Sequence, residues 1–501
     1  MMSRTTLPAT VYTAEQTRAL DHLATQAFAI PGFRLMQRAG HALFALIQGR
    51  WPESRSITLL CGSGNNGGDG FIVAGLAQQQ GIQVQVLTFG HHPFEEQLTG
   101  EALDAFRWAE SLGVQWQAWQ PYIEFQGDLI VDAILGTGLK GDVRGSVREA
   151  ISKLNQQNKP VVSVDIPSGL CSDTGTVLGV CVRAQATLTF IGVKQGLLTH
   201  QGVDYVGELY FDNLRVPDEL YERVPVSVFR TEHQDLLELL PARQRSAHKG
   251  SFGHLLVIGG AEGMGGAAIM AAQSAARSGA GLTSLATRPE HVLAALTRQP
   301  EIMARGVTQS HALQQMLARA SVIVAGPGLG DSSWSDSVMQ AVLESSLPQV
   351  LDADALRYLA KNPVMHPKRV ITPHPGEAAE LLGWDVAEVQ QDRFAAVRVL
   401  QQRYGGVVVL KGAGTLTFDG DVIHLCSDGN PGMASGGMGD VLAGIIGGLM
   451  AQGLKAVDAA RIGVFVHAQA ADRCAMTLGE RGLLASDLIE QLPFILNNKQ
   501  E

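Results

Sequence analysis

Short apolar runs rich in β-branched residues recur along the whole chain, and they constrain its fold more than any other feature. The first half carries such runs at 56–61, 82–88, 128–134, 160–166 and 186–191. The second half carries them at 254–260, 282–287, 321–326, 348–354, 369–373, 407–412 and 415–418. Runs that are apolar on both faces and alternate with helix-like segments are typical of a parallel sheet covered by helices on both sides. The pattern predicts an α/β chain with three-layer αβα architecture.

The stretch between the two halves has a different character. Residues 213–250 contain three prolines and many charged residues, and they include no long buried run. A chain of 501 residues is also long for a single hydrophobic core. We therefore predict two α/β domains, residues 1–226 and residues 227–501.

Composition excludes several classes of protein. The formal net charge of −10 argues against a nucleic-acid binder, which needs a basic face. The five cysteines have no CxxC spacing, so they indicate a reducing compartment and neither a disulfide framework nor a zinc site. The N-terminus lacks the apolar segment of a signal peptide, and no apolar run reaches the roughly 20 residues that cross a bilayer. We expect a cytoplasmic protein that binds neither nucleic acid nor membrane.

A glycine-rich loop directly follows the apolar run at 56–61. A strand-to-helix turn of this kind presents backbone N–H groups, and the helix end adds partial positive charge, so phosphate is a suitable ligand. Its spacing is neither GxGxxG nor that of a Walker loop. We expect an amphipathic helix from Phe71. The alternative is a tight turn in which Asn65 and Asp69 cap that helix.

Two further strand ends in the first half carry polar residues. Asp132 precedes a second glycine loop, and Asp165 and Ser168 follow the next apolar run. Ligands of such sheets gather beyond the carboxyl ends of the strands, so the three loops are expected to converge on one crevice. Together with Asn66 they make it rich in oxygen atoms, which suit an alkali or alkaline-earth cation better than a transition metal.

The motifs NNGGDG, DAILGTGLKG and VDIPSGL together resemble the N-terminal domain of the NAD(P)H-hydrate epimerases, and the resemblance runs over about residues 10–220. It implies a Rossmann-like fold and a potassium ion held by Asn66, Asp132 and Ser168. It also implies that the dinucleotide hydrate contacts residues of all three loops: Asn65, Asn66, Gly67, Gly68, Asp69, Gly136, Thr137, Gly138, Leu139, Lys140, Gly141, Asp142 and Asp165.

The chemistry of an epimerase needs a group that moves a proton. Carbon 6 of the hydrate carries a hydroxyl and is bonded to the ring nitrogen, so its configuration can be lost by ring opening or by departure of hydroxide. A positioned carboxylate can act as the proton carrier. We select Asp165 for this role over Asp69.

The second half also ends its strands in polar or glycine-rich loops. The segment 253–281 predicts a strand, a glycine turn and a helix of small residues, and 324–330 predicts another strand-end loop. Small side chains such as Ala267 and Ala268 permit close approach of a ligand or of a neighbouring element, and tight packing is the alternative.

Three more segments carry candidate polar groups. Asp352 and Asp354 end a strand, and His374 lies between two prolines in a stiff loop, where a lone histidine is otherwise more often structural. The segment 407–420 predicts a hairpin with Lys411 at its turn, where the lysine and nearby amides can meet a nucleotide. A plain hairpin turn is the alternative.

The sequence GGMGD places Gly437, Gly439 and Asp440 directly before an apolar helix-like run. Asp440 is either a helix cap or a chemical group beside an anion-binding loop. The loops of this half resemble the ribokinase-like fold, in which the amides of a GxGD motif form an anion hole and its aspartate is the general base. Sugar kinases usually carry Asp-Thr before these glycines, whereas this chain has residues 433–435, Met-Ala-Ser, which argues against a sugar kinase.

The motifs TPHPGEAAELLG, VLKGAGT and NPGMASGGMGD resemble the NAD(P)H-hydrate dehydratases, over roughly residues 235–495. That family uses ADP or ATP, and the fused arrangement favours ADP. The resemblance implies contacts with the hydrate from Ala268, Gly328, His374 and Asp440. It implies contacts with the adenine nucleotide from Lys411, Gly412, Ala413, Gly414, Thr415 and Gly439. Magnesium is expected with the nucleotide, and the family implies a homo-oligomer.

The two resemblances concern the same damaged cofactor and therefore support each other. They predict a bifunctional enzyme that epimerises the R and S hydrates and dehydrates the S form, with Asp440 as the base and with release of AMP or ADP and phosphate. The alternative is a ribokinase-like small-molecule kinase with a non-catalytic ligand-binding N-terminal domain.

Overall fold

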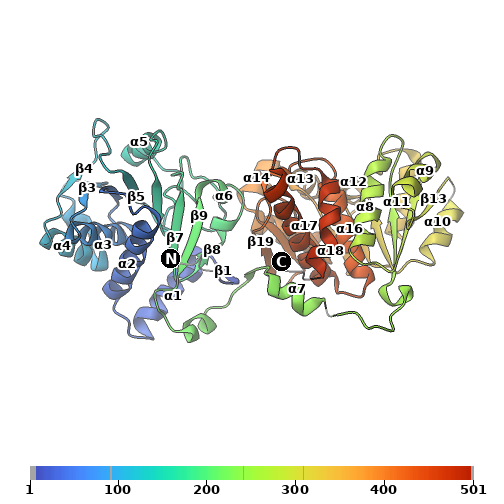
Figure 1. Cartoon of the computed structure of the whole chain (residues 1–501), viewed down its shortest axis with the longest axis horizontal. Coiled ribbons are helices and arrows are strands. Elements are labelled where there is room, and N and C mark those ends of the chain that lie inside the picture. Colours follow the sequence, from blue (N-terminus) through green and yellow to red (C-terminus); the bar gives the residue numbers. More distant parts are fainter. Residues whose placement is uncertain (1–6, 91–92, 241, 309, 498–501) are drawn as a thin grey trace. The chain divides into compact units, whose positions relative to one another are not determined.

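The computed structural model describes residues 7–90, 93–240, 242–308 and 310–497, and Figure 1 shows their course. The chain divides into two compact units, Met1–Val228 and Phe229–Glu501. The division falls within the proline-containing stretch of residues 213–250. Each unit has its own sheet and its own hydrophobic core, so each is described by itself.

The first unit contains a seven-stranded sheet whose described pairings are all parallel, in the order β4-β3-β2-β5-β6-β7-β9. The chain runs outward from β2 to β4 and then returns to place β5 on the other side of β2, so the order reverses between β2 and β5. Such a reversal opens a crevice at the carboxyl ends of the strands. The strands are β2 (Ser56–Cys61), β3 (Gln83–Thr88), β4 (Trp116–Ala118), β5 (Leu129–Ala133), β6 (Val161–Val164), β7 (Ala186–Phe190) and β9 (Glu208–Asp212).

A short parallel pair in the same unit lies outside that sheet. It joins β1 (Thr10–Tyr12) to β8 (Val193–Lys194) and places Tyr12 opposite Lys194. The five apolar runs predicted for this half all contain strands, which confirms a parallel sheet. The strands β1, β4, β8 and β9 were not predicted, because they are short or only partly buried.

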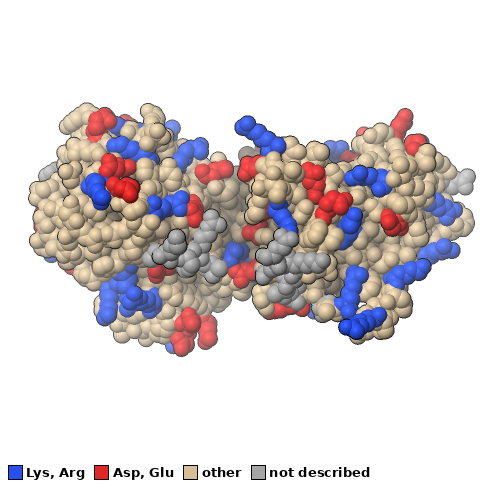
Figure 2. Space-filling model, viewed as in Figure 1, with Lys and Arg blue, Asp and Glu red and all other residues tan. Residues whose placement is uncertain are grey.

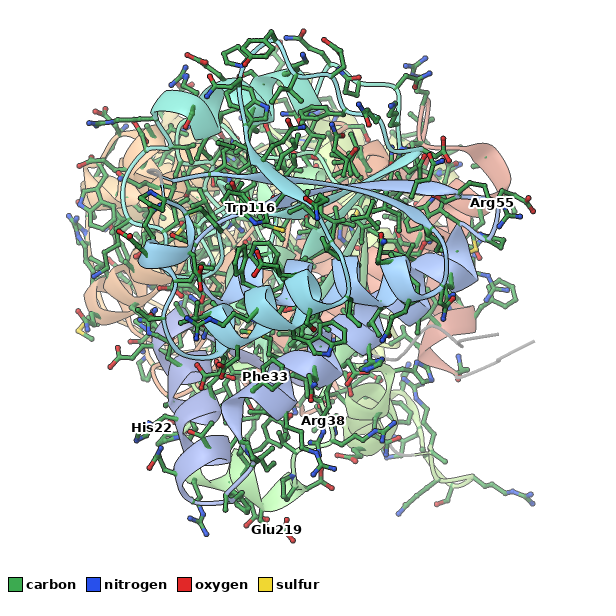
Figure 3. All side chains as sticks on the ribbon, turned by 90° about the vertical axis from the view of Figure 1, so that its left-hand side faces the viewer. His22, Phe33, Arg38, Arg55, Trp116 and Glu219 are labelled. Carbon is green, nitrogen blue, oxygen red and sulfur yellow. The ribbon has the colours of Figure 1, made fainter. Side chains whose placement is uncertain are left out.

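Helices cover both faces of the first sheet. Trp116, labelled in Figure 3, packs with Phe94 and Phe106 at centroid separations of 5.8 and 5.6 Å. The described helices are α1 (Ala14–Gln26), α2 (Gly32–Arg50), α3 (Asn65–Gln79), α4 (Gly100–Ser111), α5 (Gly145–Leu154), α6 (Gly202–Tyr205), and the 3-10 turns η1 (Glu95–Gln97), η2 (Gln195–Leu198) and η3 (Asp218–Arg223).

Helix α3 corrects one expectation. It begins at Asn65 rather than at Phe71, and it is not amphipathic, because residues 70–77 are buried on every side. It packs between the sheet and helices α2 and α4, which explains why residues 70–77 include no polar side chain.

The second unit contains a sheet with the order β13-β12-β11-β14-β15-β16-β17-β18-β19. Its pairings are parallel up to β17, and β17, β18 and β19 then form an antiparallel meander. The predicted hairpin at 407–420 is thereby confirmed. The strands are β10 (Val228–Arg230), β11 (His254–Ile258), β12 (Leu282–Thr287), β13 (Met303–Gly306), β14 (Val322–Ala325), β15 (Gln349–Leu351), β16 (Arg369–Ile371), β17 (Val407–Leu410), β18 (Thr415–Phe418) and β19 (Ile423–Cys426).

Helices again lie on both faces of this sheet (Figure 1). They are α7 (His233–Leu239), α8 (Gly265–Arg277), α9 (Val292–Arg298), α10 (Ser310–Leu317), α11 (Ser333–Leu343), α12 (Asp354–Lys361), α13 (Pro375–Leu382), α14 (Val386–Gln391), α15 (Arg393–Tyr404), α16 (Met438–Ala451), α17 (Ala456–Leu478), α18 (Ala485–Leu496), and the 3-10 turns η4 (Lys249–Phe252), η5 (Pro289–His291) and η6 (Pro431–Met433).

Helix α16 is buried along almost its whole length and packs closely on α8. A Cβ added to Gly444 would clash with the carbonyl oxygen of Ala271. The small residues of both helices therefore let two backbones approach each other.

Acidic and basic side chains are interspersed over the visible face of each unit (Figure 2). Among the described residues, no helix is both long and apolar enough to cross a membrane.

Candidate active sites

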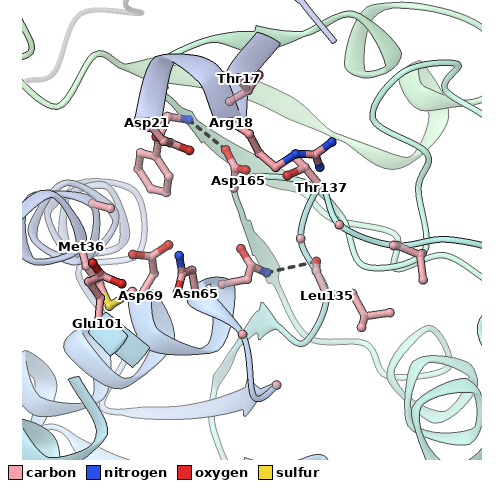
Figure 4. A pocket seen from close by; sticks show the side chains of 18 of the residues that line it. Thr17, Arg18, Asp21, Met36, Asn65, Asp69, Glu101, Leu135, Thr137 and Asp165 are labelled. Atoms are coloured by element: carbon pink, nitrogen blue, oxygen red, sulfur yellow. Dashed lines mark hydrogen bonds between the residues drawn. The ribbon is translucent and has the colours of Figure 1, made fainter. Parts of the chain in front are cut away.

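A cavity of about 710 Å³ opens at the carboxyl ends of the strands of the first unit (Figure 4). Its walls come from α1, α2, the start of α3, and the loops after β2, β5 and β6. The predicted convergence of three loops on one crevice is thereby confirmed. The predicted ligand-contacting residues that line it are Asn65, Asn66, Asp69, Gly136, Thr137, Gly138, Leu139, Lys140 and Asp165.

Four predicted contact residues are not part of the cavity lining: Gly67, Gly68, Gly141 and Asp142. Gly67 is buried, and a Cβ there would clash with the carbonyl oxygen of Gly62, so this glycine closes the turn. A Cβ on Gly68 would meet the side chain of Met36 at 2.6 Å. These two glycines support the loop by packing, and their contact with a ligand stays a prediction.

Neither Asn65 nor Asp69 caps helix α3. The N-cap is Gly64, and no side chain accepts a hydrogen bond there. The first N–H groups of the helix therefore remain available to an anion at the cavity wall. The capping alternative is therefore wrong, and contact of this loop with a ligand stays a prediction.

The residues predicted to hold potassium gather at the loops after β5 and β6. Asp132 is fully buried, and its carboxylate accepts hydrogen bonds from the hydroxyl of Ser163 (2.8 Å) and from the backbone N–H (2.8 Å) and hydroxyl (2.5 Å) of Ser168. The carbonyl oxygen of Leu135 accepts from the Asn66 amide at 3.1 Å and from the Ser168 hydroxyl at 3.2 Å. One carboxylate with amide, hydroxyl and carbonyl oxygens is a donor set that fits a hard cation.

Burial raises the pKa of Asp132, and the hydrogen bonds from Ser168 and Ser163 oppose that shift. Across the described parts of the chain, no cluster of three or more His, Cys, Asp or Glu side chains forms a metal site. A cation in the first unit would therefore be held mainly by neutral oxygen atoms around a single carboxylate.

Asp165 is held firmly at the cavity wall. Its φ of +63° turns the chain directly after β6, a conformation that is costly for a non-glycine residue. One carboxylate oxygen accepts from the ammonium of Lys194, from the Thr189 hydroxyl and from the Phe190 N–H, the last two at 3.1 Å. Because the Lys194 side chain is only 1% exposed, this ion pair is sealed from solvent on the lysine side.

Two of the other carboxyl groups that line the same cavity have raised pKa values. Burial raises the pKa of Asp69 well above its usual range, with the charges of Asp165 and Asp21 adding to the shift and Lys194 opposing it. Desolvation likewise raises the pKa of Asp21 to about 6, with Lys194 opposing and Asp165 adding. Sequence reasoning missed Asp21 and Lys194, because neither belongs to a glycine loop. The apolar segment around Lys194 was the sequence signal that could have indicated a buried lysine.

The candidate site of the second unit is built around Lys411. Its ammonium lies 2.7 Å from a carboxylate oxygen of Asp352 and 3.6 Å from one of Glu377. Asp352 is nearly fully buried and also accepts from the Thr372 hydroxyl at 2.8 Å. A Cβ on Gly439 would lie 3.1 Å from Asp352 and 3.2 Å from Lys411. The glycine loop, the hairpin lysine and the end of β15 therefore meet at one point.

Asp440 is the third residue of α16, and it is not a helix cap. The N-cap is Gly437, which has a φ of +90° and makes no side-chain cap. Burial raises the pKa of Asp440 to about 7, with Asp352 adding and Lys411 opposing. A carboxyl group with a pKa near neutrality is well suited to accept a proton.

His374 caps helix α13. Its ring nitrogen accepts from the N–H groups of Gly376 (3.0 Å) and Glu377 (3.3 Å), while the Glu377 carboxylate accepts from the His374 N–H at 2.7 Å. The structural role considered for this histidine is therefore present. Its side chain is still 56% exposed, so contact with substrate stays a prediction.

Ala268 and Gly328 shape the loops near the start of α8. Ala268 has no exposed surface, so its methyl group packs in the core instead of facing a ligand. Gly328 has a φ of +55°, and a Cβ there would lie 2.5 Å from the carbonyl oxygen of Met264. Close packing of neighbouring segments explains why both positions carry small residues. Any contact of a ligand near Ala268 must therefore be made by the residues next to it.

A buried arginine supports the predicted nucleotide loop. Arg393 of α15 is 1% exposed, and its guanidinium donates to the carbonyl oxygens of Lys411, Leu410 and Gly414, each at 3.2 Å. Burial lowers its pKa to about 10. Gly412 has a φ of +136°, and a Cβ there would lie 2.6 Å from Arg393. Sequence reasoning missed this arginine, which carries no local motif and precedes the loop by 18 residues.

The second unit has the architecture of the ribokinase-like superfamily. A solved structure of a ribokinase-like superfamily protein from Enterococcus faecalis V583 matches with a TM-score of 0.51 and 30% identity, over 54% of this chain and 95% of that chain. Residues 255–494 match a family model described as NAD(P)H-hydrate dehydratase. Residues 32–196 match a model described as YjeF-related protein N-terminus.

Full-length relatives unite the two units. The chain is 47% identical to the bifunctional NAD(P)H-hydrate repair enzyme Nnr of Coxiella burnetii, over 97% of this chain and 99% of that protein. It is also 47% identical to the enzyme of that name from Vibrio cholerae, over 98% of this chain and 99% of that protein. The chain belongs to the family of bifunctional NAD(P)H-hydrate repair enzymes.

Proposed function

We propose that this protein repairs hydrated NAD(P)H in two steps. The first unit interconverts the R and S hydrates, and the second unit dehydrates the S form at the expense of ADP or ATP, releasing AMP or ADP and phosphate. The observation that carries the proposal is Asp440, a carboxyl group with a pKa of about 7 at the glycine-capped start of α16, beside Lys411. The names of the full-length relatives support the same reading.

The dehydration uses Asp440 as general base. Asp440 takes the proton of the carbon 6 hydroxyl, whose oxygen attacks the terminal phosphoryl group and displaces the shortened nucleotide. The resulting phosphate ester then leaves carbon 6 with the bonding electrons, helped by the lone pair of the ring nitrogen. Loss of a proton from carbon 5 restores the dihydropyridine. The open N–H groups of the α16 start and the Lys411 charge stabilise the developing negative charge.

The ligands of the second unit are proposed from its loops. The nucleotide would contact Lys411, Gly412, Ala413, Gly414, Thr415 and Gly439. The hydrate would lie against Gly328, His374 and Asp440, near Ala268. The described residues form no cluster of acidic side chains that could hold a metal. Magnesium would therefore arrive with the nucleotide phosphates, whose charge it neutralises.

In the first unit, the hydrate would occupy the cavity of about 710 Å³ with its phosphates toward the start of α3. Asn66, Asp132 and Ser168 would hold potassium, which supplies fixed positive charge beside the ligand. A carboxyl group of the cavity moves the proton, and both Asp165 and Asp69 line the wall. We also propose a homo-oligomer, which light scattering can measure.

The decisive experiment is to incubate the protein with mixed R and S hydrates, with ADP, with ATP and without nucleotide. The proposal predicts full recovery of NADH absorbance with release of inorganic phosphate, and none without nucleotide. Recovery of NADH from the S form alone would contradict the proposed epimerase activity. A stable phosphorylated product without release of phosphate would instead indicate a small-molecule kinase.

A further inference from the structure

The carboxyl groups in the cavity of the first unit differ in how they are held. Asp165 has one oxygen engaged by Lys194, Thr189 and Phe190. Asp69 and Asp21 line the same cavity, and within the described residues neither side chain has a hydrogen-bond or ion-pair partner. Glu101 of α4 also lines the cavity without such a partner among the described residues. The cavity therefore contains one fixed carboxylate, that of Asp165, and three carboxyl groups that are free to meet a ligand.

We propose that Asp69 is the acid that transfers the proton during epimerisation, and that Asp165 is a fixed anion rather than the proton carrier. This inference rests on the proposed function of the first unit. Asp69 projects into the cavity from the start of α3, and Asp165 faces it from the end of β6 (Figure 4). An uncharged acid needs no counter-ion at this wall, whereas the ionised Asp165 has one in Lys194.

Burial, followed by the charges around it, favours the protonated form of Asp69. Asp165 and Asp21 are the negative groups that add to the rise in its pKa, while Lys194 is the positive group that opposes them. The other charged side chains of the cavity wall are Arg18 of α1, Glu101 of α4 and Lys140 of the loop after β5. The combined effect of Asp165 and Asp21 on the pKa of Asp69 therefore exceeds that of Lys194, which is already paired with Asp165.

A protonated Asp69 favours departure of the hydroxyl as water. Asp69 gives its proton to the carbon 6 hydroxyl, the carbon–oxygen bond breaks, and its electrons leave with the water molecule. The lone pair of the ring nitrogen forms a double bond to carbon 6, and Asp165 and Asp21 stabilise the resulting cation. Water then adds to the opposite face of carbon 6 and loses a proton to solvent, from which Asp69 is protonated again. Ring opening would instead begin with a base, and the surrounding charges disfavour an ionised Asp69.

The test compares Asp69→Asn, Asp165→Asn and Asp21→Asn in the full chain. The substrate is the R hydrate, and epimerisation is followed against pH after subtraction of the spontaneous rate. Dehydration of the S hydrate in the same preparation reports that the second unit is intact, and hydrogen exchange in β7 reports that the first unit of each variant is folded. Asp104→Asn, which removes an exposed carboxylate of α4, is the matched control.

The wild-type kcat/KM for epimerisation is expected to fall as pH rises through the raised pKa of Asp69. Asp69→Asn should lose about 100-fold or more at pH values below that pKa, the size expected for a general acid, and the loss should shrink as pH rises. Asp165→Asn should shift the fall to lower pH, because it removes a negative charge and leaves Lys194 unpaired. Asp21→Asn should shift it the same way by less.

Four results separate the possibilities. Asp69→Asn with an unchanged rate and pH profile would overturn the inference, and so would loss of the pH-dependent fall in Asp165→Asn alone. In ¹⁸O-water, each inversion should place a solvent oxygen on carbon 6, and retention of the original oxygen would contradict the departure of water. A wild-type protein that does not epimerise the hydrate at all would contradict the proposed function itself.

Discussion

Both units place carboxyl groups around a single lysine at the carboxyl ends of parallel strands, yet the two lysines differ in accessibility. The Lys194 side chain is 1% exposed and forms an ion pair with Asp165. Lys411 is 19% exposed and is shared between Asp352 and Glu377. A sealed ion pair fixes a charge in the wall of a cavity, whereas an accessible one can exchange a carboxylate for a phosphate. The comparison therefore supports the proposal that Lys194 positions a charge and that Lys411 binds a ligand.

The two reactive acids show a second contrast. Asp69 and Asp440 both lie near the start of a buried helix that follows a glycine N-cap without a side-chain hydrogen bond. Burial and neighbouring acids raise the pKa of both. For Asp440 the value is about 7, so an appreciable fraction is ionised and can act as a base. Burial raises the pKa of Asp69 well above its usual range, which suits an acid.

The largest expected effect concerns the base of the second unit. Asp440→Asn should lower kcat for ADP-dependent dehydration by about 10³-fold, because general base catalysis is worth roughly 10²–10⁴. Epimerisation of the R hydrate should be unchanged, because Asp440 belongs to the other unit. Coupled assays of both reactions on one preparation measure this. Loss of both activities in a folded variant would contradict the division of labour.

The sealed lysine of the first unit is expected to contribute to stability. Lys194→Met should lower the free energy of unfolding of that unit by about 2–3 kcal/mol, because it leaves the partly buried Asp165 carboxylate unpaired. Hydrogen exchange in β7 measures the change, with β11 of the second unit as the internal reference. Lys194→Met combined with Asp165→Asn should recover part of the loss, and no recovery would show that the lysine acts by packing alone.

The two activities should depend on pH in opposite directions. Dehydration requires the ionised form of Asp440, so its kcat/KM should rise with pH and level off above about 7. Epimerisation requires the protonated form of Asp69 and should fall as pH rises. Each limb changes by about tenfold per pH unit beyond its pKa. If kcat/KM changed in the same direction with pH for both reactions, Asp69 and Asp440 could not act as an acid and a base respectively.

A smaller effect is expected at the support of the nucleotide loop. Arg393→Lys removes the fork that holds the carbonyl oxygens of Lys411, Leu410 and Gly414. The KM for ADP should rise by about tenfold, the equivalent of one charge-assisted hydrogen bond, with little change in kcat. Steady-state kinetics tests this. A fall in kcat at constant KM would indicate that Arg393 acts on the chemistry instead.

Local patterns predicted the parts of the fold that local physics determines. Twelve apolar runs became strands because buried β-branched residues favour them. The loops around Asn65, Gly136 and Asp165 were expected to meet because parallel strands end at the same edge of a sheet. The strands β4 and β9 were missed because their residues are only partly buried or exposed, which weakens the apolar pattern. The extent of α3 was missed because its glycines resemble a loop.

The sequence by itself determined two α/β units, the positions of their glycine loops and the presence of an acid after GGMG. Only the tertiary structure decided which of these acids are paired and which are free. Lys194 reaches Asp165 from 29 residues away, Lys411 reaches Asp352 from 59, and Asp21 comes from a helix without any motif. The pKa of a carboxyl group depends on its burial and on charges brought close in space, and neither can be read along the chain.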